Sequence, residues 1–312
     1  MASAYIFPGQ GSQAVGMGQA LAAASAAARA VFEEVDDALG QKLSRLMFEG
    51  PEAELTLTEN AQPAIMAHAI AVLRVLESDG GIRLADKAAF VAGHSLGEYS
   101  ALCAAGSLGL ADTARLLKLR GQAMQAAVPV GEGAMAALLG ADIDVAEQAA
   151  RQGAAGDTCE VANDNAPGQV VISGHKAAVE RAIEAAKLLG VKRGMLLPVS
   201  APFHCALMAP AAERMAAALA DALLLAPFVP LVANVTAAAV ADPASIRDLL
   251  VRQVTGRVRW RESVAVLVGL GVDRFVELGG KVLGPMIKRT EPDAATLSLV
   301  TMDDIEAAAK AL

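Results

Sequence analysis

The segment from residue 87 to residue 106, KAAFVAGHSLGEYSALCAAG, restricts most strongly the folds that this chain can adopt. AFVA (89–92) has the length and apolarity of a buried strand, and the alanines and leucines that follow favour a helix. Between them lies GHSLG (93–97), a G-x-S-x-G pattern whose glycines permit a tight turn with Ser95 at its tip. An ordinary glycine turn also fits these letters, but the flanking strand and helix favour a nucleophile elbow.

Short apolar segments alternate with longer helical ones over most of the chain. This order is typical of an α/β fold with a mostly parallel sheet. The expected strands are AYIF (4–7), AFVA (89–92), PLVAN (230–234) and DRFVEL (273–278). Helices are expected near residues 17–40, 61–78, 96–105, 110–127, 205–222 and 259–269.

The stretch from 128 to 199 departs from this order. After the hinge VPVGEG (128–133) the pattern predicts strands at 134–139, 158–163, 169–173 and 193–199, with helices at 142–153 and 175–189. The resulting βαββαβ order is that of a ferredoxin-like unit. We therefore expect a small subdomain at 128–199, inserted into a large one formed by residues 1–127 and 200–312.

Composition excludes several classes of protein. Hydrophobic residues make up 54% of the chain, but no apolar run reaches the roughly 18–20 residues that span a bilayer, so no membrane segment is expected. The amino terminus lacks the features of a signal peptide, which predicts a cytoplasmic protein. A net charge of −8 and 3% aromatic residues are unlike a nucleic-acid binder.

Cysteine and histidine positions predict neither a disulfide framework nor a metal site. The three cysteines contain no CxxC pair, and the four histidines contain no pair at metal-ligand spacing. We expect buried, reduced cysteines and no bound metal.

A nucleophilic serine needs a base, and His204 is the candidate that the sequence favours. It lies in the loop SAPFHC, where the chain leaves the predicted small subdomain. His68 lies in an apolar helical run, His175 begins a helix, and His94 adjoins the serine and points elsewhere at such a turn. A purely structural role for His204 remains the alternative.

Arg120 lies on an otherwise apolar helix face. In the helix near 110–127 it shares spacing with Thr113, Leu117 and Met124. The hypothesis is a buried guanidinium that binds a carboxylate through two points, and the alternative is a structural ion pair or a snorkelling side chain. The loop FPGQGSQ (7–13) can offer backbone N–H groups to an anion, or be an ordinary turn.

Together these segments resemble the bacterial malonyl-CoA:acyl-carrier-protein transacylase family and the related acyltransferase domains of fatty-acid and polyketide synthases. The stretches that carry the resemblance follow the family's order over almost the whole chain. They are FPGQGSQ (7–13), GHSLGEYSAL (93–102), RG followed by MQ (120–125), NAPGQVVISG (165–174), VSAPFHC (199–205) and RQVTGRVRW (252–260).

The resemblance implies roles for particular residues. Ser95 would be the nucleophile and His204 its general base and then acid, and the backbone N–H groups of Gln10 and Leu96 would form the oxyanion hole. Arg120 would bind the free carboxylate of malonyl. The backbone carbonyl of Gln253 would orient the histidine in place of an acidic residue.

The resemblance also implies a fold and partners. It implies a hydrolase-like α/β core with a ferredoxin-like small subdomain, and a monomer without a cofactor. The substrate would be a coenzyme A thioester, malonyl-CoA, and the acceptor the phosphopantetheine thiol of an acyl carrier protein. The reaction would be a ping-pong transfer through a malonyl-serine intermediate.

Phe203 departs from many stand-alone members of this family, which have serine before the histidine. The phenylalanine resembles malonyl-selecting synthase domains, where the bulky ring disfavours an α-methyl branch. The alternatives that remain open are a serine thioesterase or other hydrolase, an acyltransferase subunit of a malonate decarboxylase system, and a non-catalytic subunit that keeps the fold.

Basic residues of the carboxyl-terminal third suggest a docking surface for an acidic carrier protein. The alternative is a solvated surface whose charges pair internally. The residues are Arg252, Arg257, Arg259, Arg261, Lys281, Lys288 and Arg289.

Overall fold

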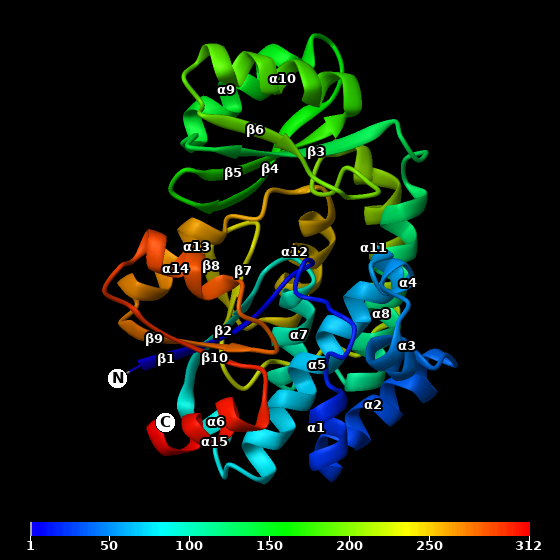
Figure 1. The fold of residues 1–312 in the computed structure, drawn as a ribbon, viewed down its shortest axis with the longest axis vertical. Coiled ribbons are helices and arrows are strands. Elements are labelled where there is room, and N and C mark those ends of the chain that lie inside the picture. Colours follow the sequence, from blue (N-terminus) through cyan, green and yellow to red (C-terminus); the bar gives the residue numbers. More distant parts are fainter. Residues whose placement is uncertain (1) are drawn as a thin grey trace.

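A six-stranded sheet forms the centre of the large lobe in the computed structural model, which describes residues 2–312 (Figure 1). The strand order is β10-β9-β1-β2-β7-β8, and all neighbours are parallel except the antiparallel pair β7 and β8. The predicted α/β fold with a mostly parallel sheet is therefore confirmed. The strands are β1 (Ala2–Phe7), β2 (Ala88–Gly93), β7 (Leu231–Ala233), β8 (Ala238–Val240), β9 (Val272–Leu278) and β10 (Ala295–Leu299).

Helices cover both faces of this sheet. Strand β1 shows why both faces must be covered, because it carries apolar side chains on each of them. Tyr5 and Phe7 point to one face and Ala4 and Ile6 to the other, and all four are fully buried. The first pair belongs to a core shared with α2 (Ala26–Leu39), α5 (Thr58–Ser78), α7 (Gly97–Ala104) and α8 (Leu110–Ala126). The second pair packs with α13 (Trp260–Gly269) and α14 (Leu283–Thr290).

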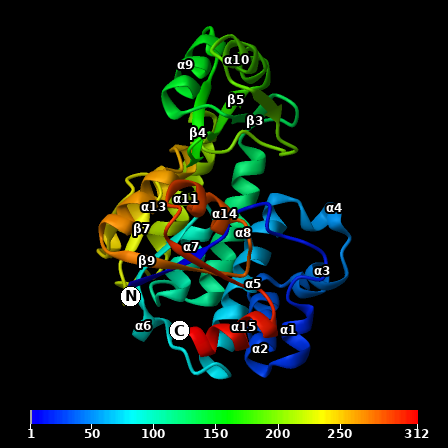
Figure 2. The ribbon, with the colours of Figure 1, turned by 60° about the vertical axis from the view of Figure 1, so that its left-hand side comes forward.

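The small lobe contains an antiparallel sheet of four strands in the order β4-β5-β3-β6, and it lies at the end of the molecule opposite α15 (Figures 1 and 2). Its elements follow the expected βαββαβ order. They are β3 (Gly133–Leu139), α9 (Ile143–Ala154), β4 (Cys159–Ala166), β5 (Gln169–His175), α10 (Lys176–Leu188) and β6 (Arg193–Leu196). The exact limits proposed for the two subdomains, 128–199 and the remainder, stay a prediction.

The two faces of the small sheet have different neighbours. Leu138 and Ile172 pack beneath α9 and α10, whereas Met135 and Val171 belong to the core of the large lobe. The last strand ends at Leu196 rather than at the expected residue 199, because the following residues leave the sheet and line a cavity.

Several short or edge elements were not among those expected. They are α3 (Leu43–Glu49), α4 (Glu52–Leu55), α6 (Leu84–Lys87), α12 (Pro243–Thr255), α15 (Met302–Ala311), β8, β10 and α14. The helix expected near 17–40 is present as α1 (Gln19–Ala24) and α2, which are separated at Ser25, and η1 (Ala206–Met208) occupies the start of the helical segment expected near 205–222. The helix expected near 205–222 is α11 (Ala209–Asp221). For α12 the start signals are present: Asp242 caps the helix by accepting from the Ser245 N–H, and Pro243 occupies the first turn.

Three expectations from composition and residue spacing can be compared with the structure. The cysteines Cys103, Cys159 and Cys205 are all buried and unpaired. No helix within residues 2–312 is long and apolar enough to cross a membrane. Over the same residues, no group of three or more His, Cys, Asp or Glu side chains is placed to hold a metal ion.

The lobes are tied together where α12 leads into α13. Val258 donates its N–H to the Ala162 carbonyl (2.8 Å) and accepts from the Asp164 N–H (2.9 Å), so the linker extends the edge of β4. The Arg261 guanidinium donates from Nε and Nη2 to the Asp164 carboxylate at 3.0 and 2.8 Å. That carboxylate is 1% exposed. A buried carboxylate of this kind depends on its partner.

We expect Arg261→Ala to lower the free energy of unfolding by about 2–3 kcal/mol, because it leaves the buried Asp164 charge without a partner. Urea denaturation followed by circular dichroism measures the change. Arg252→Ala is the matched control, since its pair with Asp248 is exposed and we expect no measurable change. Equal stabilities for the two variants would show that the fork on Asp164 contributes little.

Candidate active site

Ser95 occupies a turn between β2 and α7. This turn forms only because the backbone at Gly93 and Gly97 packs closely against neighbouring backbone. The φ of Ser95 is 54°, which lies in the left-handed region that residues other than glycine rarely adopt. A Cβ on Gly93 would lie 1.9 Å from the Gly97 carbonyl oxygen, and a Cβ on Gly97 would lie 2.2 Å from the Phe7 carbonyl oxygen. Both glycines of the G-x-S-x-G pattern are therefore required sterically, and they present the serine at the start of α7.

Asn234 holds this turn from the neighbouring strand. It directly follows β7, and its Oδ1 accepts from the Ser95 N–H at 2.8 Å while its Nδ2 donates to the Gly93 carbonyl at 2.7 Å. Asn234 is fully buried. One amide thus satisfies two backbone groups of the turn and locks the serine in its strained conformation.

The Ser95 hydroxyl is paired with His204. Oγ and Nε2 lie 2.7 Å apart, although the two residues are 109 positions apart in the chain. His204 itself has a φ of 57°, so the loop before η1 is also held in an uncommon conformation. Cys205 Sγ donates to the Pro202 carbonyl at 3.2 Å and closes this loop on itself.

Backbone carbonyls, rather than an acidic side chain, orient the imidazole. Nδ1 lies 2.9 Å from the Gln253 carbonyl oxygen and 3.2 Å from the Gly256 carbonyl oxygen. A carbonyl can only accept, so Nδ1 carries the proton and Nε2 presents its lone pair to the serine. Burial, with a further contribution from the positive charge of Arg120, lowers the pKa of His204 to about 3. The ring is therefore neutral and ready to act as a base.

Arg120 lies directly beside the serine. The stripe predicted on α8 is buried, and Arg120 is 1% exposed. Its Nη2 donates to Ser95 Oγ at 3.1 Å and to Gln253 Oε1 at 2.8 Å, and its Nη1 donates to Gln62 Oε1 at 2.7 Å. Its Nε has no acceptor within residues 2–312. A buried cation with a spare donor next to a nucleophile is suited to bind an anionic group of an acyl chain.

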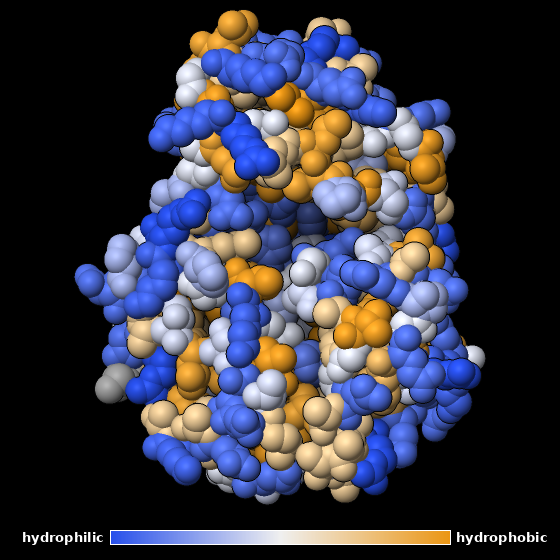
Figure 3. Space-filling model, in the orientation of Figure 1, coloured by the Kyte–Doolittle hydropathy of each residue, from blue (hydrophilic) through white to orange (hydrophobic). Residues whose placement is uncertain are grey.

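A cavity of about 320 Å³ opens above these groups, between the two lobes. The space-filling view shows the face of the molecule hollowed at the same level (Figure 3). The small lobe supplies Met135, Asn163 and the segment from Leu197 to Val199. The large lobe supplies Gln10, Gly11, Gln13, Thr56, His94, Ser95, Phe203 and His204. The lining combines apolar side chains with a few polar groups, as ligand cavities usually do.

The structure brings all of the sequence-predicted site residues to this cavity or its floor. Gln10 and Phe203 line it, and Leu96 follows Ser95 and is 1% exposed. Thr58 Oγ1 donates to Gln10 Oε1 at 3.2 Å and fixes the FPGQGSQ loop against α5. Within residues 2–312, neither the Gln10 nor the Leu96 backbone N–H has a protein acceptor, so both remain available to a ligand.

Two other histidines, His94 and His68, are alternatives to His204 as the base. His94 Nε2 lies 2.8 Å from Asn165 Oδ1, and its ring centroid is 5.8 Å from that of Trp260. His68 is buried within α5, where burial lowers its pKa to about 4. Neither is hydrogen-bonded to Ser95.

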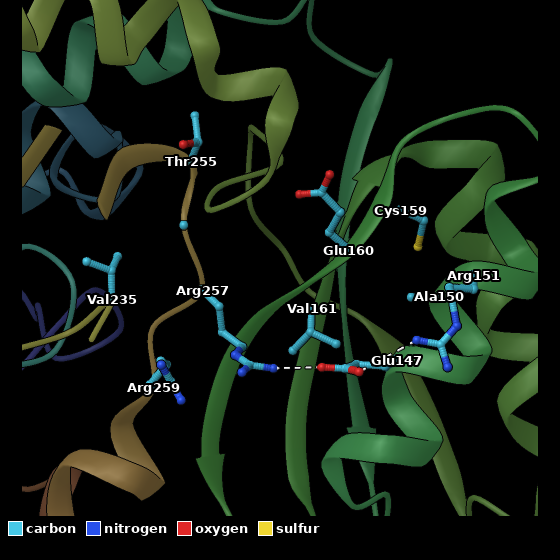
Figure 4. Close-up of a pocket in the computed structure, with 11 residues that line it drawn as sticks. Glu147, Ala150, Arg151, Cys159, Glu160, Val161, Val235, Thr255, Arg257 and Arg259 are labelled. Carbon is cyan, nitrogen blue, oxygen red and sulfur yellow. Dashed lines mark hydrogen bonds and ion pairs between the residues drawn. The ribbon is translucent and has the colours of Figure 1, made fainter. Parts of the chain in front are cut away.

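A second groove, of about 530 Å³, is bordered by the segment from Thr255 to Arg257, which carries the Gly256 carbonyl that contacts His204 (Figure 4). It is lined by Gly256 and by a chain of charges in which Glu147 of α9 contacts Arg257 at 2.9 Å and Arg151 at 3.6 Å. Glu160, which lines the same groove, accepts from the Ala206 N–H at 3.1 Å, two residues after His204. The small lobe therefore supports both segments that hold the imidazole.

Most of the basic residues considered for carrier docking are occupied in ion pairs. Arg252 pairs with Asp248, Arg257 with Glu147, Arg259 with Glu262, Arg261 with Asp164 and Lys281 with Asp304. This pairing favours the alternative that the charges of this segment are balanced internally.

Three polar residues of the site were missed from the sequence. They are Gln62 and Glu98, which bond to Arg120 and Gln253 respectively, and Asn234. Asn234 gave one usable signal, because a polar residue at the end of a strand next to the serine strand lies at the edge where ligands bind. Gln62 and Glu98 sit in apolar helical contexts, where the sequence does not reveal which buried polar groups meet.

The α/β fold and the serine-histidine pair on a strand-to-helix turn define the class of serine-dependent α/β enzymes. The family model described as "Acyl transferase domain" matches residues 4–280. The malonyl CoA-acyl carrier protein transacylase of Salmonella typhimurium is 47% identical over 92% of this chain and 92% of its own. That of Escherichia coli K12 is 45% identical over 99% and 98%. The chain therefore belongs to the acyl transferase family, among the malonyl CoA-acyl carrier protein transacylases, and the resemblance seen in its motifs is confirmed.

Solved structures agree in fold over the full length. The acyl-carrier-protein S-malonyltransferase of Bartonella henselae is 54% identical with a TM-score of 0.97, and covers 100% of this chain and 99% of its own. A complex titled "type II PKS acyl-carrier protein in complex with its malonyl-transacylase" matches at 40% identity and a TM-score of 0.96, covering 100% of both chains. The core of the protein is thus hydrolase-like, with an added small subdomain.

We expect the reactivity of Ser95 to stay nearly constant between about pH 7 and pH 5. For an ordinary histidine of pKa about 6.5, the fraction in the neutral, basic form would fall roughly thirtyfold from pH 7 to pH 5. His204, in contrast, stays neutral until the pH approaches 3. The rate of labelling by a fluorophosphonate measures this, with Ser95→Ala as the unlabelled control. A rate that falls with a midpoint near pH 6.5 would contradict the low pKa of His204.

Proposed function

We infer that this protein transfers the malonyl group of malonyl-CoA to the phosphopantetheine thiol of an acyl carrier protein. The observation that carries this inference is the contact between Arg120 Nη2 and Ser95 Oγ at 3.1 Å, which places a buried cation beside the nucleophile. An esterase has no general need of a cation on the acyl side, whereas a malonyl carrier must neutralise a carboxylate. The curated relatives named as malonyl transacylases support the same activity.

The first half-reaction forms a malonyl-serine. Ser95 Oγ attacks the thioester carbonyl while its proton moves to His204 Nε2, and the Nδ1–H bond to the Gln253 carbonyl supports the imidazolium that forms. The backbone N–H groups of Gln10 and Leu96 receive the oxyanion. The carbon–sulfur bond then breaks, His204 returns the proton to the leaving thiolate, and coenzyme A departs.

The second half-reaction reverses these steps with a different thiol. The pantetheine thiol gives its proton to His204 and attacks the serine ester, and Ser95 recovers its proton as the new thioester leaves. Coenzyme A leaves before the second thiol attacks the malonyl-serine, so the mechanism is ping-pong. No metal and no cofactor takes part in any of these steps.

Arg120 selects the acyl group. The malonyl carboxylate, on a short chain attached to Ser95 Oγ, lies within reach of a guanidinium that already contacts this oxygen. The carboxylate supplies an acceptor for Arg120, whose Nε has no acceptor within residues 2–312. Gln62 and Gln253 hold the guanidinium group in its orientation. Phe203, which lines the cavity next to His204, disfavours an α-methyl branch on the acyl chain.

The acceptor is an acyl carrier protein, as in the solved complex of a relative with its carrier protein. We propose in addition a cytoplasmic monomer that interacts with neither nucleic acid nor membranes. These points rest on composition and on the family resemblance.

We expect incubation with malonyl-CoA to add one malonyl group to the protein, and Ser95→Ala to abolish the addition. Intact-mass spectrometry measures it. His204→Ala should slow the acylation by several powers of ten, because base and nucleophile act as a unit. A mass increase that persists in Ser95→Ala would refute the assignment, and release of the label by water as fast as by carrier protein would indicate a hydrolase.

We expect Arg120→Ala to lower kcat/KM for malonyl-CoA by roughly one-hundredfold to several thousandfold, because breaking a buried charge pair costs about 3–5 kcal/mol. Acetyl-CoA lacks the carboxylate and should lose little. Arg120→Lys should fall between, since an ammonium keeps the charge without the fork. Arg115→Ala, on the exposed face of the same helix, is the control. Equal declines for malonyl and acetyl in a folded Arg120→Ala would make Arg120 a structural residue.

A further inference from the structure

A second buried charge, Glu98, lies under the nucleophile. It occupies the first turn of α7 and is 1% exposed. Its Oε2 accepts from Gln253 Nε2 at 2.7 Å and from the Asn234 backbone N–H at 3.3 Å. Its Oε1 has no partner within residues 2–312. The mechanism above gives this carboxyl group no part, yet a carboxylate buried so deeply and so incompletely paired is costly.

The Gln253 amide connects Glu98 to Arg120. Arg120 Nη2 donates to Gln253 Oε1 at 2.8 Å, and Gln253 Nε2 donates onward to Glu98 Oε2 and to the Ser95 carbonyl at 2.9 Å. The amide can face only one way while it bonds to a donor on one side and a carboxylate on the other. The charge of Glu98 therefore bears on the orientation of the group that holds Arg120.

The charged and titratable groups that face this carboxyl come from α8 and α7. From α8 the group is Arg120, and from α7 itself it is Tyr99, whose ring lies under the Arg120 guanidinium with the Cζ 5.8 Å from its centroid. From α12 and from the end of β7 the facing groups are the uncharged Gln253 amide and Asn234 N–H. Burial raises the pKa of Glu98 to about 7, against the smaller opposing effects of these hydrogen bonds and of Arg120.

The number of charges changes when a malonyl group arrives. In the empty site one buried cation, Arg120, faces one buried carboxylate, Glu98. A malonyl carboxylate on Arg120 adds a second negative charge to the same cation, and two carboxylates that share a buried site do not both stay ionised easily. The malonyl carboxylate contacts Arg120 directly, whereas Glu98 is separated from it by an amide, so Glu98 is the group that gives up its charge.

We propose that Glu98 is a positioning and charge-balancing residue for malonyl recognition, which neutralises Arg120 in the empty enzyme and takes up a proton from solvent when the malonyl carboxylate replaces it. This proposal rests on the malonyl transfer proposed above and adds a residue to it. No covalent bond changes at Glu98, and the proton returns to solvent when the malonyl group leaves.

The sign of the resulting pH dependence follows directly. Below about pH 7 Glu98 is already protonated and the Arg120 charge is free to bind malonyl. Above that pH each malonyl group must bring a proton, so kcat/KM for malonyl-CoA falls relative to acetyl-CoA by up to about tenfold per pH unit. Acetyl brings no charge and requires no proton. Effects of pH on His204 or on the thiols are common to both substrates and cancel in the ratio.

The experiment measures the ratio of kcat/KM for malonyl-CoA to that for acetyl-CoA between about pH 6 and pH 9, in wild type and in Glu98→Gln. Glutamine keeps the volume and can still accept from Gln253, but it cannot ionise. We expect the wild-type ratio to fall above about pH 7, and the Glu98→Gln ratio to stay flat and to exceed that of wild type at the alkaline end. A merely structural Glu98 would lower both substrates together and leave the slope unchanged.

A second measurement uses the wild-type protein alone. In a weakly buffered indicator solution near pH 8, stoichiometric acylation by malonyl-CoA should take up a proton that acylation by acetyl-CoA does not, approaching one per Ser95 acylated. This measurement tests the role of Glu98 even if Glu98→Gln does not fold. Equal proton changes for the two substrates, or a wild-type ratio independent of pH, would overturn the role of Glu98. Failure to transfer malonyl at any pH would overturn the proposed function instead.

Discussion

The close approach of α7 to the strands β1 and β2 fixes the geometry of the site. A Cβ at Gly97 would overlap the Phe7 carbonyl, and one at Gly93 would overlap Gly97 itself, so the helix can begin here only because both positions lack side chains. This contact forces Ser95 into the left-handed region and directs its hydroxyl out of the sheet. It also places the FPGQGSQ loop, which directly follows β1, beside the serine.

A buried cation is the second determinant of the site, and it explains why so many uncharged amides surround the serine. Arg120 has little contact with water, and its Nη1 and Nη2 donate to Gln62, Gln253 and Ser95, whereas Nε has no acceptor within residues 2–312. Amides satisfy two of the guanidinium nitrogens without placing a negative charge in direct contact with them, so a substrate carboxylate can take the direct contact and the more distant Glu98 can give up its charge. The same charge, together with burial, keeps His204 neutral, so one side chain serves both the choice of acyl group and the readiness of the base.

The orientation of His204 shows how the two lobes act together. Its Nδ1 bonds to carbonyls at the end of α12 and in the linker that follows, and that linker is attached to β4 of the small lobe. Ion pairs from Arg257 to Glu147 and from Arg261 to Asp164 brace the same segment. In a triad an acidic side chain orients the imidazole. Here backbone carbonyls can do the same because tertiary contacts fix the segment that carries them.

The fold class, the elbow and the βαββαβ order of the small lobe could be predicted from the sequence, because each depends on local patterns of apolar residues and glycines. It also pointed to Arg120 through the spacing of one helix face, and to His204 through its loop. Gln253 entered only through the family resemblance, since the helix that carries it was not predicted.

The polar groups that meet inside the protein could not be predicted from the sequence and became visible in the folded chain. Glu98 and Arg120 come from different helices, Gln62 and Asn234 from elements far apart in the chain, and nothing in their local sequence records that they converge on one serine. The same is true of the ion pairs that occupy most of the basic residues near the carboxyl terminus, whose partners lie as far away as α9 and β4. The physical reason is that hydrogen bonding and charge balance are properties of a three-dimensional neighbourhood, whereas a sequence pattern reports only which side of an element is buried.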